Sequence, residues 1–169
     1  MEDELKGDEE RGDSSTAKSS QNSFREAQKR TMNLLSRRNY SAFELSQKLR
    51  SHFDSSIVEQ TLKWAHEQKW FPDENELADR TTELLIQKGK GSQYISQHLK
   101  EKGLKPKKIP FEVEYKAAKN LAESKLVLLN KKTGSSPEFK VKEKLFRFLL
   151  QRGFPFEVVR KVINEKLTS

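Results

Sequence analysis

The chain has 169 residues, of which 33% are hydrophobic and 34% charged, with a net charge of +8 and no cysteine. This composition excludes disulfides, thiolate metal sites and thiol catalysis, fits a reducing cytoplasmic compartment, and favours several thin helical cores over one thick core. No apolar run approaches the roughly 20 residues of a membrane span and no signal-peptide pattern opens the sequence, so we expect no membrane association.

Residues 1–22 form an acidic segment that we predict to be disordered, because it lacks hydrophobic periodicity and is rich in Ser, Gly, Asp and Glu. Residues 1–20 hold seven acidic and three basic residues, a net charge of −4, so the rest of the chain carries +12 against the +8 of the whole. The segment either solvates the protein or mimics nucleic acid by folding back on the basic body. The body is either a lysine-rich soluble surface or a binder of nucleic acid or of an acidic protein face.

Residues 23–71 are predicted to form a first repeat of three helices. Apolar positions spaced three and four apart start near Phe24 and indicate a helix that ends before Asn39. Ser41 and Glu44 have the spacing of a capping box at the start of a second helix. The third helix has an apolar face made of Ile57, Val58, Leu62 and Ala65.

Residues 72–118 are predicted to form a second repeat, again of three helices. Asp73 caps its first helix, with Glu76 at capping-box spacing. A further helix is expected to open at Pro106, a favoured first-turn residue. Pro110 would remove a hydrogen bond and kink that helix, so we expect the helix to be short or to restart just after Pro110.

Residues 119–169 are predicted to form the third repeat. The preceding helix is expected to run on through Leu126–Leu129, with a loop over residues 130–136. Pro137 and Pro155 mark the starts of the last two helices. In total we expect eight or nine helices and no strand. The fold class is therefore all-α, with three tandem three-helix, helix-turn-helix-like repeats in an elongated curved array, preceded by the acidic tail.

One helix–turn–helix pattern is written three times. The equivalent apolar positions are Leu35, Leu45 and Leu49 in the first copy, Leu85, Ile95 and Leu99 in the second, and Leu149, Val159 and Ile163 in the third. Asn39, Gly89 and Gly153 coincide at the turn. A left-handed residue closes many helices, and Asn and Gly tolerate that conformation best, so we predict it at all three positions.

The residue after each turn differs between the copies. Tyr40 and Phe154 are placed to clamp the helices on both sides of the turn, as in a hydrophobic staple. Lys90 takes that place in the second copy. We therefore expect the Gly89–Gly91 turn to be the loosest, with faster amide exchange than Asn39–Ser41.

Residues that carry chemistry are sparse. The three histidines, at 52, 66 and 98, have no metal-ligand spacing. The run Gly89-Lys-Gly-Ser is better explained as a helix-connecting turn than as a phosphate cradle, although amides at a helix N-terminus could meet one phosphate. No nucleophile–base pair is evident. We expect no enzyme activity, no metal and no cofactor.

Aromatic residues near the end of the third helix admit two interpretations. Trp64, Trp70 and Phe71 either pack in the core between adjacent units or form a base-stacking platform, and core packing is the more common role.

Basic residues recur at corresponding places around the three turns and on the helices that follow. Some of them would only complement helix dipoles. Placed at one edge of stacked units, they would also make a charged strip that follows a phosphate backbone without reading bases. The candidate binding residues are Arg37, Arg38, Lys88, Lys90, Arg152, Arg160 and Lys161.

Three segments together resemble the bacterial regulatory protein family RecX. They are LLSRRNYSAFEL from Leu34, GKGS from Gly89, and RFLLQRGFPFEVVRKVI from Arg147, and their order and spacing agree with that family over about residues 27–167. The chain departs from the family pattern at Asn75-Glu76, Pro110 and Pro155. The resemblance implies a curved helical monomer that binds in the groove of the RecA–DNA filament and restrains RecA's ATPase and strand exchange, without catalytic residues or cofactor.

Two other functions stay open. One is a stand-alone, sequence-nonspecific protein that binds single- or double-stranded DNA through its phosphates, since paired short helices also build helix-turn-helix readers. The other is a helical scaffold for an acidic protein. The resemblance favours the RecA filament as partner, with the seven basic residues seating the protein on RecA and on nearby phosphates.

Overall fold

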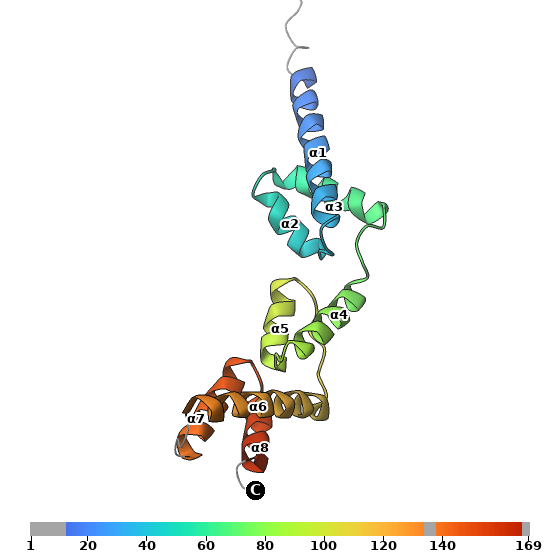
Figure 1. Cartoon of the computed structure of the whole chain (residues 1–169). Helices are drawn as coiled ribbons and strands as arrows, with labels where there is room; N and C mark the ends of the chain where they lie inside the picture. Colours follow the sequence, from blue (N-terminus) through green and yellow to red (C-terminus); the bar gives the residue numbers. More distant parts are fainter. Residues whose placement is uncertain (1–12, 134–137, 167–169) are drawn as a thin grey trace, which may run out of the picture. The chain divides into compact units, whose positions relative to one another are not determined.

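The computed structural model describes residues 13–133 and 138–166, and this part of the chain contains eight α-helices and no strand (Figure 1). The helices group into two compact units, Met1–Pro72 and Asp73–Ser169, which are described separately below. Three separate apolar clusters replace a single thick core. The prediction of an all-α fold built from tandem helical units is confirmed.

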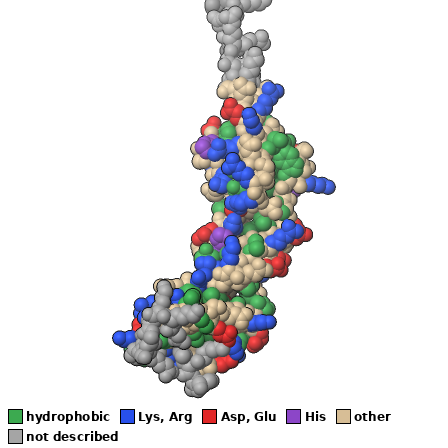
Figure 2. Space-filling view, viewed as in Figure 1, with side chains coloured by type: hydrophobic (Ala, Val, Ile, Leu, Met, Phe, Trp, Pro, Cys, Tyr) green, Lys and Arg blue, Asp and Glu red, His purple; other side chains and the backbone are tan. Residues whose placement is uncertain are grey.

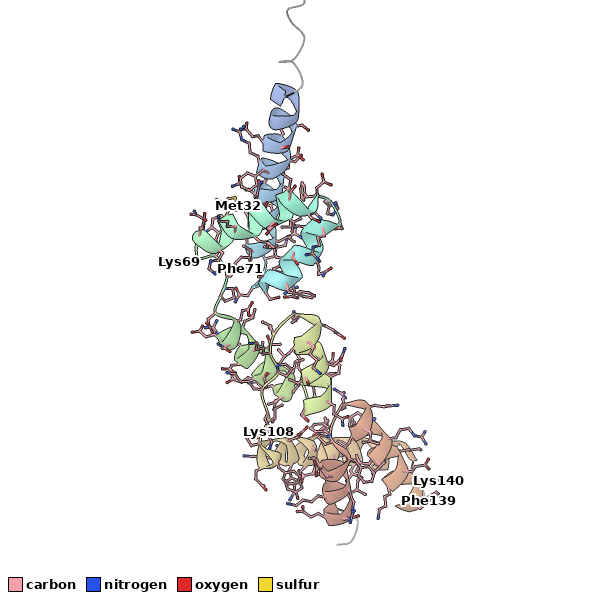
Figure 3. All side chains as sticks on the ribbon, turned by 180° about the vertical axis from the view of Figure 1, so that it is seen from behind. Met32, Lys69, Phe71, Lys108, Phe139 and Lys140 are labelled. Carbon is pink, nitrogen blue, oxygen red and sulfur yellow. The ribbon has the colours of Figure 1, made fainter. Side chains whose placement is uncertain are left out.

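The first unit is a three-helix domain. Its elements are α1 (Asp13–Leu35), α2 (Ala42–Arg50) and α3 (Ser55–Glu67). Both α1 and α2 pack on α3, around a cluster centred on Tyr40, Leu45, Leu49 and Val58. Phe71, which follows α3 (Figure 3), packs against the same cluster. Phe71 is therefore a core residue of its own unit, whereas the sequence analysis expected packing between adjacent units.

Helix α1 starts earlier than predicted. It begins at Asp13, whereas the acidic segment was expected to stay irregular to Asn22 and the helix to begin near Phe24. No glycine or proline interrupts Asp13–Leu35. Once packing stabilises the C-terminal half of the helix, each further residue toward the N-terminus can join it at a small free-energy cost. Residues 1–12 lie outside the described part of the chain.

The turn between α1 and α2 confirms one prediction and contradicts another. The Ser41 hydroxyl accepts from the Glu44 amide at 3.1 Å and the Glu44 carboxylate accepts from the Ser41 amide, which is the expected capping box. Asn39 does not have a positive φ; α1 ends four residues earlier, at Leu35, and Asn39 lies in the link to α2. Among the described non-glycine residues a positive φ, of 54°, occurs at Lys69, where α3 ends (Figure 3).

Two buried threonines in the first unit offer a matched pair. Thr31 and Thr61 are both fully buried, but the Thr61 hydroxyl donates to the Ile57 carbonyl at 2.7 Å and the Thr31 hydroxyl has no partner. We expect Thr31→Val to raise the free energy of unfolding by about 1 kcal/mol, because it removes a desolvated hydroxyl without changing shape. Thr61→Val should bring no such gain. Urea unfolding measures both, and equal shifts for the two variants would contradict the prediction.

The second unit contains the other five helices: α4 (Glu74–Gln87), α5 (Ser92–Glu101), α6 (Phe111–Thr133), α7 (Glu138–Gln151) and α8 (Phe156–Lys166). One cluster joins α4 and α5 around Ala78, Ile95, Leu99 and Leu104. A second joins α6, α7 and α8 around Phe154 and Leu145. The apolar positions repeated along the sequence are buried or half-buried in all three copies, which confirms their register.

The described chain has eight helices and not nine because no separate helix precedes α6 in the segment around Pro106. Helix α6 begins directly after Pro110, whose carbonyl accepts from the amides of Val113 and Glu114. No helix opens at Pro106, because a helix begun there would meet Pro110 in its interior. Helix α6 then passes the predicted repeat boundary at Ala118 and continues to Thr133, beyond its expected end at Leu129 and into the predicted loop. Residues 134–136, the rest of the predicted loop, and Pro137, the predicted start of the next helix, lie outside the described residues.

Candidate functional site

Two turns of the second unit lie back to back and carry three of the predicted basic residues. Gly89 and Gly153, with φ of 68° and 83°, end α4 and α7. In both turns the next residue donates to the carbonyl five positions back, Lys90 to Leu85 and Phe154 to Leu149, as in a Schellman motif. The left-handed conformation predicted at the two glycines is confirmed.

Backbone hydrogen bonds join the two turns. The Gly91 amide donates to the Arg152 carbonyl at 2.9 Å, and the Gln93 amide donates to the Gly153 carbonyl at 3.0 Å. The Arg152 side chain donates to the Lys88 carbonyl at 3.2 Å. The second turn is thus tied to the third, which favours a firm turn over the loose one predicted from the sequence.

We expect the order of amide exchange to be the reverse of the one predicted from the sequence. The amides of Gly89, Lys90 and Gly91 all donate to backbone carbonyls. Within the described residues, the amides of Asn39 and Tyr40 donate to no backbone carbonyl. Hydrogen exchange measured by NMR should show slower exchange at residues 89–91 than at residues 39–40. Faster exchange at residues 89–91 would contradict the pairing of the turns.

The amides that looked available for a phosphate are occupied. The Ser92 amide, at the start of α5, donates to the Glu114 carboxylate at 2.6 Å, and Glu114 is buried. With Gly91 and Gln93 donating to the third turn, the first amides of α5 are taken by the protein itself. The run Gly89-Lys-Gly-Ser is a helix-connecting turn, and the alternative of a phosphate cradle is excluded.

The basic side chains at the paired turns are held in place by their neighbours. The Lys90 ammonium lies 4.0 Å from the centre of the Tyr94 ring, and the Arg152 guanidinium lies 5.2 Å from that of Phe148. Such contacts fix long side chains that would otherwise be freely rotating. Lys90 therefore packs on the Tyr94 ring and does not enter the apolar core as Tyr40 and Phe154 do in the other two copies.

A groove of about 710 Å³ runs beside the paired turns along α6. Its charged lining residues are Lys88, Lys116 and Arg152, and Asn120 and Ser124 add polar groups. Its apolar lining comes from Ile86, Val113, Ala117 and Leu121. Lys116 was missed by the sequence analysis because α6 belongs to no copy of the repeated turn, although its spacing from Val113 and Asn120 places all three on one helix face.

Arg160 and Lys161 lie apart from the paired turns, on the exposed surface of α8. They line a shallow hollow of about 360 Å³ together with Phe156, Glu157 and Asn164. The Lys161 ammonium also lies 4.5 Å from the centre of the Tyr115 ring on α6. The seven candidates thus include two separate groups within the second unit.

Arg37 and Arg38 belong to the first unit and have different surroundings. Arg37 is exposed. The Arg38 guanidinium pairs with Glu44 at 3.0 Å and stacks on Tyr40 at 3.6 Å. The hydrogen bond to Glu44 raises the pKa of Arg38 above its ordinary value. Because its charge is paired with that of Glu44, Arg38 stabilises the turn of the first unit and is less available to an external anion.

The described residues contain no cluster of His, Asp or Glu side chains suited to a metal ion. Among these residues, His52 lies 2.6 Å from the Arg30 guanidinium. Trp64 and Trp70 form an edge-to-face pair with ring centres 4.8 Å apart. No helix in the described ranges is long and apolar enough to cross a membrane.

The charges of the surface are mixed. Figure 2 shows Lys and Arg side chains over both units, with Asp and Glu side chains among them. Together with the helices, these features define a class of protein: an all-helical protein built from small helical units, with a basic groove beside two paired turns.

Comparison with known proteins identifies the family. Residues 112–163 match the model of the third three-helix domain of RecX, and residues 27–64 match that of the first. The regulatory protein RecX of Haemophilus ducreyi is 33% identical over 124 residues, covering 72% of this chain and 80% of that protein. RecX of Legionella pneumophila (strain Corby) is 31% identical over 140 residues, covering 82% and 93%. The chain belongs to the RecX family of regulatory proteins.

Solved structures agree with this fold. A crystal structure of regulatory protein RecX has a TM-score of 0.70 at 23% identity and covers 94% of this chain. The match covers 80% of the chain in that crystal structure. The crystal structure of RecX from Lactobacillus salivarius has a TM-score of 0.67 at 18% identity, covering 85% of this chain and 96% of that one.

Proposed function

We propose that this protein binds the RecA–DNA filament and inhibits RecA's ATPase and strand-exchange activities. The observation that carries the proposal is its membership of the RecX family, because the resemblance to RecX implies a modulator of RecA. A regulator that acts by occupying a surface needs no catalytic residue, metal or cofactor. We further propose that it works as a cytoplasmic monomer and contacts both RecA and DNA.

We place the protein–protein contact at the groove beside α6. Lys88, Lys116 and Arg152 are the charged residues that line it, so the groove presents positive charge without a carboxylate in its lining. Its apolar side chains add a hydrophobic surface that a partner could bury. A partner surface with acidic residues around an apolar side chain fits this combination.

Charge reversal in the groove tests the placement. Lys88→Glu combined with Lys116→Glu should raise the protein concentration needed for half-inhibition of RecA's ATPase by roughly tenfold, because both charges would then repel an acidic partner. Lys140→Glu combined with Lys144→Glu is the matched control, with the same change in net charge on the exposed surface of α7. Equal loss of inhibition in both variants would remove the groove from the contact.

RecA's DNA-dependent ATPase, measured with and without this protein over a salt series, tests the function itself. Inhibition at protein concentrations far below that of DNA supports the filament as target. Inhibition that only follows occupancy of the DNA supports a stand-alone DNA-binding protein. Arg37, Arg160 and Lys161 are exposed candidates for it that lie outside the groove and outside the Arg38–Glu44 ion pair. Absence of inhibition supports the scaffold for an acidic protein.

A further inference from the structure

Two exposed phenylalanines stand in equivalent positions of the second unit. Phe111 and Phe156 are the first residues of α6 and α8, each directly after a proline. Their side chains are 37% and 60% exposed. Both rings also rest against a neighbouring ring: Phe111 stacks on Tyr115 with an interplanar angle of 8°, and Phe156 meets Phe146 edge to face. Each ring is thus fixed while one part of it faces solvent.

Cations surround both rings. The Lys161 ammonium lies 4.9 Å from the centre of the Phe111 ring, and Arg160 and Lys161 line the hollow that contains Phe156. Lys100 and Lys108 line a larger hollow, of about 830 Å³, that contains Phe111. Figure 3 shows Lys108 beside the start of α6. The two hollows adjoin, since Glu157 lines both.

The carboxylates in the two hollows are unequal. Glu114 is buried and accepts from the Ser92 amide, so its charge is directed into the protein. Glu157 is exposed and faces both hollows. Lys107 pairs with Asp79 at 2.8 Å and is left out of the set of available cations. Among the residues that line the two hollows, four lysines and arginines then remain against one exposed carboxylate.

We propose that this surface, which we call the aromatic strip, binds single-stranded nucleic acid. The aromatic strip consists of Phe111, Phe156, Lys100, Lys108, Arg160 and Lys161. Exposed rings interleaved with cations fit a strand whose bases stack on the rings while its phosphates meet the ammonium and guanidinium groups. A duplex keeps its bases stacked inside and offers the strip only phosphates. The strip therefore prefers single strands.

This inference deepens the proposed function by assigning the nucleic-acid contact to named rings, and it is tested without RecA. The probe is a fluorescent oligothymidylate of about 20 nucleotides, compared with a duplex of the same length, in about 50 mM salt. Fluorescence anisotropy of the full chain gives both dissociation constants. Wild-type protein should bind the single strand several-fold more tightly than the duplex.

Replacing the rings separates stacking from charge. Phe111→Leu combined with Phe156→Leu keeps apolar side chains and should weaken single-strand binding about tenfold while leaving duplex binding unchanged. Phe139→Leu is the matched control, because Phe139 is 69% exposed and lies on α7, away from Lys108 in Figure 3. Unchanged single-strand binding in the double variant, or an equal loss for the duplex, would overturn the stacking role.

Two charge variants complete the test. Glu157→Gln adds no bulk and should tighten single-strand binding several-fold, because it removes the exposed carboxylate between the hollows. Arg160→Glu combined with Lys161→Glu should weaken single-strand and duplex binding alike and reduce the salt dependence of both. No tightening in Glu157→Gln would contradict the placement of the strand.

The outcomes for the two proposals are distinguishable. Loss of RecA inhibition by the groove variants with intact single-strand preference supports both. Failure to inhibit RecA at all, with the single-strand preference and its loss on ring replacement observed, rejects the proposed function and leaves the aromatic strip in place. The absence of any single-strand preference in a protein that inhibits RecA rejects the strip alone.

Discussion

Gly91→Ala is expected to destabilise the second unit by about 3 kcal/mol or more. A Cβ atom at position 91 would overlap the Gly153 carbonyl oxygen and the Phe154 amide nitrogen, which are backbone atoms. Neither atom can move away by a rotamer change, so the two turns would have to separate. That separation would break the hydrogen bonds from Gly91 to Arg152 and from Gln93 to Gly153. Urea unfolding and hydrogen exchange of the α5 amides measure the loss.

Gly89→Ala is the control for this prediction. Its φ of 68° makes any side chain unfavourable, but the added Cβ would lie 3.1 Å from the end of the Leu121 side chain, which can adjust. We expect a loss of about 1 kcal/mol, the cost of a left-handed non-glycine residue. A larger loss at Gly89 than at Gly91 would show that conformational strain, and not contact between the turns, dominates at these glycines.

Glu114→Ala is expected to lower the free energy of unfolding of the second unit by about 2–3 kcal/mol. The Glu114 carboxylate takes the place of a side-chain cap for α5, whose N-cap residue, Gly91, has no side chain to offer. Its removal leaves the Ser92 amide without its acceptor inside the protein. Hydrogen bonds to charged groups are about twice as strong as neutral ones, so the loss exceeds that of an ordinary cap. Thermal or urea unfolding measures it.

Glu112→Ala separates this cap from general effects of charge. Glu112 lies in the same first turn of α6 but is exposed, so its loss should cost only the few tenths of a kcal/mol of an acidic residue near a helix N-terminus. Glu114→Gln keeps an oxygen acceptor and should fall between the two alanine variants. Equal losses for Glu112→Ala and Glu114→Ala would exclude capping of α5 by Glu114.

Much of the fold follows from local patterns in the sequence. The buried leucines of the repeat, the capping box at Ser41 and the restart of α6 after Pro110 are all set by residues within one or two turns of each other. Helix ends were less predictable. Asn39 has the right residue type for a left-handed turn and does not adopt it, whereas Lys69 has the wrong type and does, with φ of 54°. Tertiary packing, which local propensity does not contain, decides these positions.

The candidate sites depended even more on contacts distant in sequence. The sequence placed Lys88, Lys90 and Arg152 at equivalent turns, but only the structure brings the second and third turns together, 64 positions apart at Arg152 and Lys88. The capping of Ser92 by Glu114 links residues 22 positions apart and removed the phosphate alternative. Lys116 had no signal within the repeat, and the partnership of Phe111 with Lys161 required α6 and α8 to be packed side by side.

The hydrogen bonds between the second and third turns limit how the modules of this chain can be exchanged. A repeat protein whose modules meet only through side chains can lose or gain one copy and repack. Here, excision of α4 and α5 would leave the carbonyls of Arg152 and Gly153 without their donors. Insertion of a further copy between the second and third copies would place a different neighbour against Gly91, which has no room for a methyl group. We therefore expect the second and third copies to be exchangeable between proteins only as a pair.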